Sequence, residues 1–352
     1  MMERRKNLND KFGFVDSMKI KDFIDYEQPN EYIVESDRYS SKYSTPVLTA
    51  GQSFILGYTN ESKGIYKKGP CIIFDDFTTS VHYVDFPFKV KSSAMKILTT
   101  KSNADLKYCY YLLLSLSKMP PNHKRQWIST TSEKTHVLPS MDKQISIVKQ
   151  LDLISVTITN YTNQIENLDN LVKARFIEMF SHKGYTVLEW NDVFNTRTGK
   201  LDSNAATENG KYPFFTCSKD ILYIDDFSFD QEALLLAGNN AAGKYDVKYY
   251  NGKFNAYQRT YVLTLRGNWS YQLFRYQLED KLEYLRQQSL GGLTKYLTMK
   301  ILGELSFIIP PIEKQKEFEL FVQQVDKSRE EVKKALEKTQ QLYDSLMQEY
   351  FG

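Results

Sequence analysis

The stretch from Gln144 to Phe180, QISIVKQLDLISVTITNYTNQIENLDNLVKARFIEMF, decides how this chain is organised. Its apolar residues step alternately by four and three places, the heptad pattern of a helix that offers one face to a partner helix. The same register returns 171 places later, from Gln315 to Phe351. A repeat this long indicates two copies of one module. The heptad faces contain Leu151, Ile154, Ile158, Ile165, Leu168, Val322, Val325, Val332, Leu336 and Tyr343.

The segments that open the two heptad stretches also match, PSMDKQ at 139–144 and PPIEKQ at 310–315. A helix of about 36–40 residues is about 55–60 Å long. Neither helix can bury its apolar face alone, so we expect the two to pair antiparallel within the chain. The alternative is that each helix forms a separate oligomer interface.

The residues before each heptad stretch repeat in order as well. Each copy is preceded by the same series: a short amphipathic element, an apolar strand opened by proline, a buried strand, alternating strands and a helix. The corresponding ranges are 19–25 and 188–194, 44–49 and 211–216, 71–74 and 233–236, 81–99 and 245–265, and 106–117 and 271–287.

The sequence therefore predicts an α+β fold. Two globular domains, at 1–141 and 184–311, are separated by two long antiparallel coiled-coil helices, at 142–183 and 312–352, in a pseudo-two-fold internal repeat.

Composition limits the class of protein. With 352 residues and 41% apolar residues, the chain is long enough for several folded domains. The net charge of +3 is too small for a histone-like polycation, so DNA binding would depend on local patches. Cys71, Cys109 and Cys217 are odd in number and widely spaced, which favours reduced thiols. No apolar leader or membrane span is visible, so we expect a cytoplasmic protein.

Three patterns in the sequence resemble parts of catalytic or ligand sites. The segment Gly238–Tyr245 (GNNAAGKY) lacks the Ser or Thr of a nucleotide-binding P-loop, so a glycine-hinged loop is the favoured interpretation. The pairs Asp75-Asp76 and Asp225-Asp226 have no third ligand at metal spacing and are expected to be solvated turn residues. The four histidines form no catalytic pattern, and the motifs of nucleases and amino-methyltransferases are missing. We therefore predict no catalytic residues, no metal and no cofactor on this chain.

Basic, amide and aromatic residues gather in equivalent loops of the two halves. Basic side chains hold a protein on phosphates, while Asn, Arg and Tyr can read base edges. The alternative is a solvated surface rim. The predicted DNA contacts are Lys118, Lys124, Arg125, Trp127, Lys219, Asn239, Asn240, Lys244, Tyr257 and Arg259; His123, Lys248 and Lys253 belong to the same clusters.

Five features together carry a resemblance: the two helix openings, the heptad stretches, the YPFFT segment from Tyr212, the Gly238-Asn239 loop and the segment from Arg286 to Gly292. With these features the chain resembles the specificity subunits of type I restriction-modification systems. The resemblance covers nearly the whole chain. It departs from the family at Lys143 and Lys314, where an acidic residue often stands directly before the glutamine, and the loop before the first helix lacks the Gly-Gly of the second.

The resemblance implies a non-catalytic subunit that binds an asymmetric, bipartite site on double-stranded DNA, one half per domain, with the helices setting the spacer. Two methyltransferase subunits would dock on it and bring S-adenosylmethionine. Restriction subunits that use ATP and Mg²⁺ would join for cleavage. Two alternatives stay open: a fused or solitary methyltransferase or nuclease with unrecognised motifs, and a coiled-coil assembly protein that ignores nucleic acid.

Overall fold

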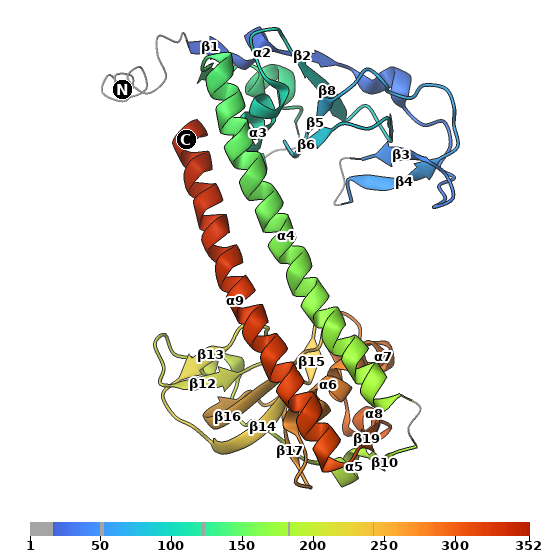
Figure 1. Cartoon of the computed structure of the whole chain (residues 1–352), viewed down its shortest axis with the longest axis vertical. Coiled ribbons are helices and arrows are strands. Elements are labelled where there is room, and N and C mark those ends of the chain that lie inside the picture. The colour runs from blue at the N-terminus through green and yellow to red at the C-terminus, as the bar shows by residue number, and fades with distance from the viewer. Residues whose placement is uncertain (1–16, 50–52, 121–123, 182–183, 242) are drawn as a thin grey trace. The chain divides into compact units, whose positions relative to one another are not determined.

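The computed structural model describes residues 17–49, 53–120, 124–181, 184–241 and 243–352. The N-terminal segment at 1–16 and His123 lie outside these residues. The chain divides into two compact units, residues 1–162 with 334–352 (unit 1) and residues 163–333 (unit 2). Each unit contains one α+β module and half of each long helix (Figure 1). We call the part before the first long helix module 1 and the part between the two long helices module 2.

Module 1 follows the predicted order. Its elements are β1 (Ser17–Lys19), α2 (Ile20–Phe23), β2 (Ile24–Glu27), η1 (Pro29–Tyr32), β3 (Thr45–Leu48), β4 (Ile55–Thr59), β5 (Cys71–Asp75), β6 (Val81–Val84), β7 (Lys89–Val90), β8 (Met95–Thr100), α3 (Leu106–Leu116), the π-helical turn η2 (Trp127–Thr131) and β9 (Thr135–Val137).

Module 2 repeats that order with two long strands, β14 (Phe229–Ala237) and β16 (Val247–Ala256), and with additional short elements. It contains β10 (Thr186–Glu189), α5 (Trp190–Val193), β11 (Phe194–Thr198), η3 (Ser203–Ala205), β12 (Tyr212–Phe215), β13 (Leu222–Ile224), β14 (Phe229–Ala237), β15 (Asn239–Asn240), β16 (Val247–Ala256), β17 (Thr260–Leu265), α6 (Tyr271–Asp280), α7 (Leu282–Gln288), β18 (Lys295–Tyr296), α8 (Met299–Gly303) and β19 (Ser306–Ile309).

The sheets of the two modules have the same topology. Module 2 has one six-stranded sheet in the order β11-β17-β14-β16-β12-β13, and module 1 has β2-β8-β5-β6 followed by a separate β4-β3-β7 sheet. In module 2 the strand β16 pairs with both β14 and β12, the latter in parallel. In module 1 the same role is divided between β6, which pairs with β5, and β7, which pairs in parallel with β3. Pro87 lies between β6 and β7 and cannot donate to a ladder, which accounts for the division.

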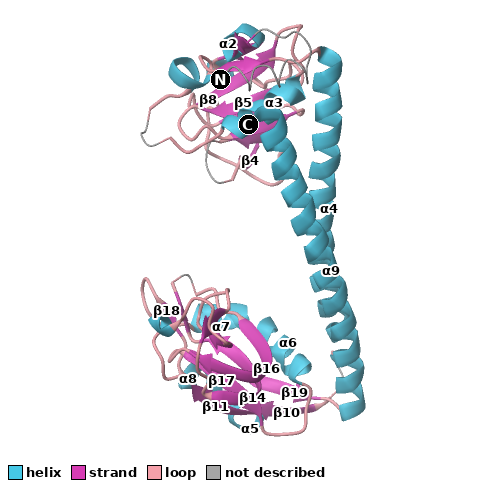
Figure 2. Ribbon diagram, turned by 90° about the vertical axis from the view of Figure 1, so that its left-hand side faces the viewer, coloured by secondary structure: helices cyan, strands magenta, loops and turns pink. Residues whose placement is uncertain are grey.

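In each module a helix after the last long strand covers the sheet that contains the central strand. In module 1, α3 packs Tyr108, Cys109 and Leu112 into a core with Ile72 and Phe74 of β5. In module 2, Figure 2 shows α6 and α7 against the sheet, and Phe274 and Leu278 enter the core with Leu234 of β14. The predicted single helix at 271–287 is divided at Lys281, whose N–H bonds Leu278 in a tightened turn.

The long helices are α4 (Met141–Phe180) and α9 (Ile312–Phe351). Within unit 1, the Tyr350 hydroxyl donates to Gln150 Oε1 at 2.9 Å. Within unit 2, Arg329 lies 2.7 Å from Asp169, and Arg175 lies 2.7 Å from Glu317. The partner on α9 moves back along the chain as α4 advances, so the paired halves run antiparallel in unit 2.

The predicted heptad faces point into packed surfaces. Leu151, Val322 and Val325 are buried, and Leu168 and Tyr343 pack against the cores of their own units. The other five, Ile154, Ile158, Ile165, Val332 and Leu336, are half-buried. The α+β class, the two long antiparallel helices and the internal repeat are thus confirmed.

Candidate nucleic-acid interface

In module 2, three loops meet where the central strand β14 ends. The N–H of Gly238 donates to the carbonyl of Arg259 at 2.9 Å, and the thiol of Cys217 donates to the same carbonyl at 3.4 Å. A Cβ on Gly238 would stand 2.3 Å from that oxygen, so the close approach requires glycine here. The contacts bring the segments that carry Asn239, Arg259 and Lys219 to one edge of the module.

The turn after Gly238 is fixed by a small β-ladder. Asn239 and Asn240 of β15 pair with Tyr296 and Lys295 of β18. Gly243 has φ +63°, a left-handed conformation that favours glycine. Because β16 and not a helix follows, this segment has no helix N-terminus to receive phosphates. The interpretation as a glycine-hinged loop between strands is supported.

The predicted contact side chains of module 2 are accessible. Lys219, Lys244 and Arg259 are exposed, while Asn239, Asn240 and Tyr257 are half-buried. Lys219 also lines a groove of about 1020 Å³ within unit 2, between the module and the long helices. Lys248, from the same sequence cluster, is tied by its Nζ to the Ser218 carbonyl at 2.7 Å and to Asp246.

In module 1, the equivalent edge lies after β5. The N–H of Lys118 donates to Thr79 Oγ1 at 3.1 Å, and the N–H of Gln126 donates to the Asp76 carbonyl at 2.8 Å. These contacts place the exposed Lys118, Lys124 and Arg125 beside the turn that follows the central strand. The structure thus gathers basic side chains at the equivalent edge of both modules.

Two predictions at this edge are wrong. Trp127 is only 1% exposed and packs edge-on against Phe74, so it belongs to the core and not to a contact surface. Asp75 and Asp76 are also buried, at 3% and 1% exposed. Asp76 Oδ2 lies 2.9 Å from Lys96 Nζ, while Oδ1 accepts the N–H groups of Gln126 and Trp127. Burial of an aspartate needs such partners, and no sequence pattern indicates that Lys96 supplies one.

The thiols and histidines have structural surroundings. Cys71 and Cys109 are buried and Cys217 is half-buried, all as free thiols; burial raises the pKa of Cys71 to about 12. His136 is half-buried, its Nε2 is 2.7 Å from the Tyr108 hydroxyl, and desolvation lowers its pKa to about 4. Among the residues that the structure describes, Cys71, Cys109 and His136 thus lack the accessible, activated character of a nucleophilic site.

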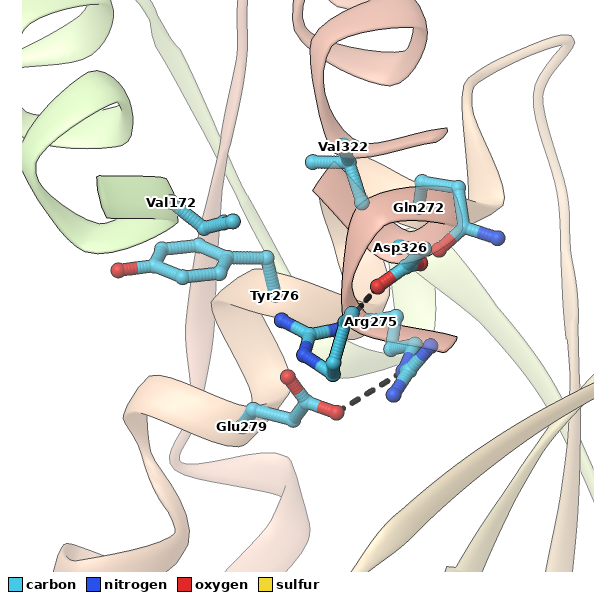
Figure 3. Close-up of a pocket in the computed structure, with 8 residues that line it drawn as sticks. Val172, Gln272, Arg275, Tyr276, Glu279, Val322 and Asp326 are labelled. Carbon is cyan, nitrogen blue, oxygen red and sulfur yellow. Dashed lines mark hydrogen bonds and ion pairs between the residues drawn. The ribbon is translucent and has the colours of Figure 1, made fainter. Parts of the chain in front are cut away.

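A charged pocket of about 50 Å³ lies in unit 2, where α6 meets the long helices (Figure 3). Arg329 pairs with Asp326 and Asp169, and Arg275 Nε lies 2.9 Å from Glu279 Oε1. Desolvation raises the pKa of Glu279, opposed by the two arginines. Each charged side chain named here has an ion-pair partner, so the pairs link the helices, while Arg329 Nε and Gln272 Oε1 are buried without a hydrogen-bond partner among the described residues.

Within the described ranges, no three His, Cys, Asp or Glu side chains stand close enough together to hold a metal ion. Nor does any helix there have the length and apolar character needed to cross a bilayer.

Comparison with known proteins agrees with this geometry. Residues 182–340 match the family model described as "Type I restriction modification DNA specificity domain". The chain is 44% identical over 171 residues to the "Type I restriction enzyme EcoR124I/EcoR124II specificity subunit" of Escherichia coli, covering 46% of this chain and 42% of that protein. It is 36% identical over 129 residues to the EcoDI specificity subunit of the same organism, covering 36% of this chain and 28% of that protein. The matches thus span less than half of the length of these relatives.

The fold has a counterpart over its whole length. The crystal structure of a type I restriction-modification S subunit from M. genitalium superposes with a TM-score of 0.70 at 17% identity, covering 98% of both chains. The chain thus has the two-module fold of that S subunit. Residues 182–340 carry a type I restriction modification DNA specificity domain.

Proposed function

We propose that this chain is the DNA-recognition subunit of a type I restriction-modification complex and that catalysis belongs to its partners. It binds a bipartite, asymmetric site on double-stranded DNA and reads one half with each module. The observation that carries this proposal is the shared strand order of the two modules, each with basic side chains at the edge after its central strand. Because the two modules share a fold but differ in amino-acid sequence, each can recognise a different half-site.

The proposed division of the chain is 1–141 and 184–311 for recognition, and 142–183 and 312–352 for the helical spacer. The proposed contacts are Lys118, Lys124, Arg125, Lys219, Asn239, Asn240, Lys244, Tyr257 and Arg259. Lysine and arginine would hold phosphates, and the amide, guanidinium and tyrosine groups would reach base edges.

The long helices would set the unread spacer between the half-sites and carry two methyltransferase subunits. Those subunits would hold S-adenosylmethionine and rotate the target adenine out of the duplex. Restriction subunits would add ATP- and Mg²⁺-dependent cleavage. Shortening α4 and α9 by one heptad each should change the spacer and leave both half-sites unchanged.

A reconstitution separates recognition from catalysis. The purified chain, given DNA with S-adenosylmethionine or with Mg²⁺, should neither methylate nor cleave. The same chain added to its methyltransferase should direct methylation to one bipartite motif. Methylation or cleavage by the chain alone would contradict the proposal and favour the enzyme alternative. Failure of the assembled complex to bind DNA at any salt concentration would favour a pure assembly role.

A further inference from the structure

Gln144 is a buried side chain at the start of α4 whose amide is used fully within unit 1. It is 0% exposed. Its Oε1 accepts the N–H of Asp105 at 2.8 Å, and its Nε2 donates to the carbonyls of Pro139 at 2.8 Å and Asn103 at 3.2 Å. Asp105 is the N-cap of α3, and its own side chain accepts the N–H of Tyr108. One glutamine therefore joins the start of the long helix to the start of the module's covering helix.

Gln315 makes the same joint in unit 2. It is 1% exposed. Its Oε1 accepts the N–H of Ser270 at 3.0 Å, and its Nε2 donates to the carbonyl of Pro310 at 2.8 Å. Ser270 is the N-cap of α6, as Asp105 is of α3. Both joints bond the N-cap N–H of the covering helix and the carbonyl of the proline five residues earlier, while Gln144 also bonds Asn103 and the N-cap residues differ.

Among the described residues, the other polar links of the two covering helices, α3 and α6, differ. In unit 1, Lys107 and Tyr111 of α3 both bond Asp152 of α4, at 2.6 and 2.8 Å. In unit 2, Gln277 of α6 bonds both backbone groups of Ile308 on β19 instead. The surrounding contacts have diverged while the glutamine joint is the same in both, which points to a requirement common to both modules.

We propose that Gln144 and Gln315 are positioning residues that fix the angle of each module on its long helix and so set discrimination between spacer lengths. A rotation of about 5° at one end of a helix of about 60 Å moves its other end by about 5 Å. That displacement exceeds the rise of about 3.4 Å per base pair. A loosened joint would therefore accept DNA with a spacer one base pair too short or too long. The base contacts at each module edge would be unchanged.

The test uses the chain in its complex with the methyltransferase, because the inference rests on the proposed recognition function. Gln144→Met and Gln315→Met, singly and together, remove the amide from an unbranched side chain of similar length. Methylation rates are measured on DNA with the native spacer and with spacers one base pair shorter and longer. The exposed Gln164→Met on α4 and Gln324→Met on α9 are the matched controls.

We expect the ratio of native-spacer to altered-spacer methylation to fall by about fivefold per joint, equivalent to about 1 kcal/mol. Selectivity against single-base changes within either half-site should stay at the wild-type value, and the controls should match wild type in both measures. Folded, active variants with an unchanged spacer ratio would overturn the proposal. So would variants that lose spacer and half-site selectivity together, because that result indicates general loosening of the module.

If a Met variant does not fold, Gln144→Glu or Gln315→Glu replaces it, since the carboxylate can still accept the N-cap N–H but cannot donate to the proline carbonyl. The same two ratios then decide the outcome. A wild-type complex that methylates no bipartite motif would instead refute the proposed function itself, so the two failures are distinguishable.

Discussion

Lys96 Nζ lies 2.9 Å from Asp76 Oδ2, and the two side chains are 0% and 1% exposed. Lys96 comes from β8, and Asp76 follows the end of β5. Lys96 Nζ also donates to Gln28 Oε1 at 3.1 Å. Since the other oxygen of Asp76 holds the backbone of Gln126 and Trp127, this buried pair anchors the segment that presents Lys124 and Arg125.

Lys96→Met should strongly destabilise unit 1, because it removes the buried counter-charge of the Asp76 carboxylate and leaves only Arg125, which is exposed and 4.0 Å away. Removing one partner of a buried pair costs about 3–5 kcal/mol. Denaturant unfolding of the full chain measures the loss. Lys101→Met is the control, since Lys101 forms an exposed pair with Asp25 at 3.6 Å, and such a pair contributes about 0–1 kcal/mol. Equal losses for the two variants would show that the Lys96 pair is not the anchor.

Lys244→Ala should weaken DNA binding by the complex and reduce its dependence on salt. A lysine that neutralises one phosphate contributes about 0.9 to the slope of log K against log salt. Titrations at several salt concentrations measure this slope. Lys211→Ala removes an exposed lysine that lies before β12 and outside the segments joined at Gly238, Cys217 and Arg259, so it should leave the slope unchanged. A Lys244 variant with the wild-type slope would place this residue outside the phosphate contacts.

Phe318→Ala should destabilise the helix pairing in unit 2. Phe318 is 0% exposed and its ring lies 5.8 Å from Phe176, 5.5 Å from Phe180 and 5.6 Å from Tyr276. Truncation of a buried Phe costs about 3–5 kcal/mol in unfolding free energy. Leu320→Ala, two residues along the same helix at 61% exposed, should change it by no more than about 0.5 kcal/mol. Similar effects from both substitutions would refute this packing.

His136 should make unit 1 sensitive to mild acid. Its pKa is lowered to about 4 in the folded protein, below its ordinary value of 6.5, so the unfolded chain takes up the proton first. Stability contributed by neutral His136 is therefore complete above pH 6.5 and is lost as the pH falls from 6.5 towards 4. Between pH 7 and pH 5 the loss is about 2 kcal/mol.

The variant His136→Gln cannot titrate and can still accept from the Tyr108 hydroxyl. Between pH 7 and pH 5, the unfolding free energy of the variant should therefore fall by about 2 kcal/mol less than that of the wild type. Chemical unfolding at pH 7, 6 and 5 compares the two chains. An equally steep fall for wild type and variant would mean that other groups account for the acid response.

The sequence predicted the parts of this protein that depend on local periodicity. Leu151, Leu168 and Val322 lie on a heptad face and are packed as that pattern predicts. The internal repeat supports these predictions, because the apolar segment 71–74 has an apolar counterpart, 233–236, at the equivalent place in the second module. The division of β6 from β7 is not predicted, because it depends on which strands pair across the whole module. Periodicity within one segment carries no information on that pairing.

The candidate site was less predictable, because residue type alone does not reveal long-range partners. Trp127 and Lys124 lie three residues apart in one basic, aromatic cluster, yet one is core and the other exposed. Asp76 looked like a solvated turn residue because its partner Lys96 is distant in sequence and reaches it only through the β5–β8 pairing. Gln144 and Gln315 occupy equivalent positions in the two helix openings, which the sequence shows. Their hydrogen bonds depend on where α3 and α6 begin, which it does not show.

The most direct test of two independent readers is the methylated motif of a module exchange. Residues 184–311 are replaced by the corresponding module of another specificity subunit, and methylated bases are mapped across the genome of cells that express the hybrid with its methyltransferase. Our account predicts a motif in which one half changes while the other half and the spacer stay as in the parent. An unchanged motif, or one altered in both halves, would contradict it.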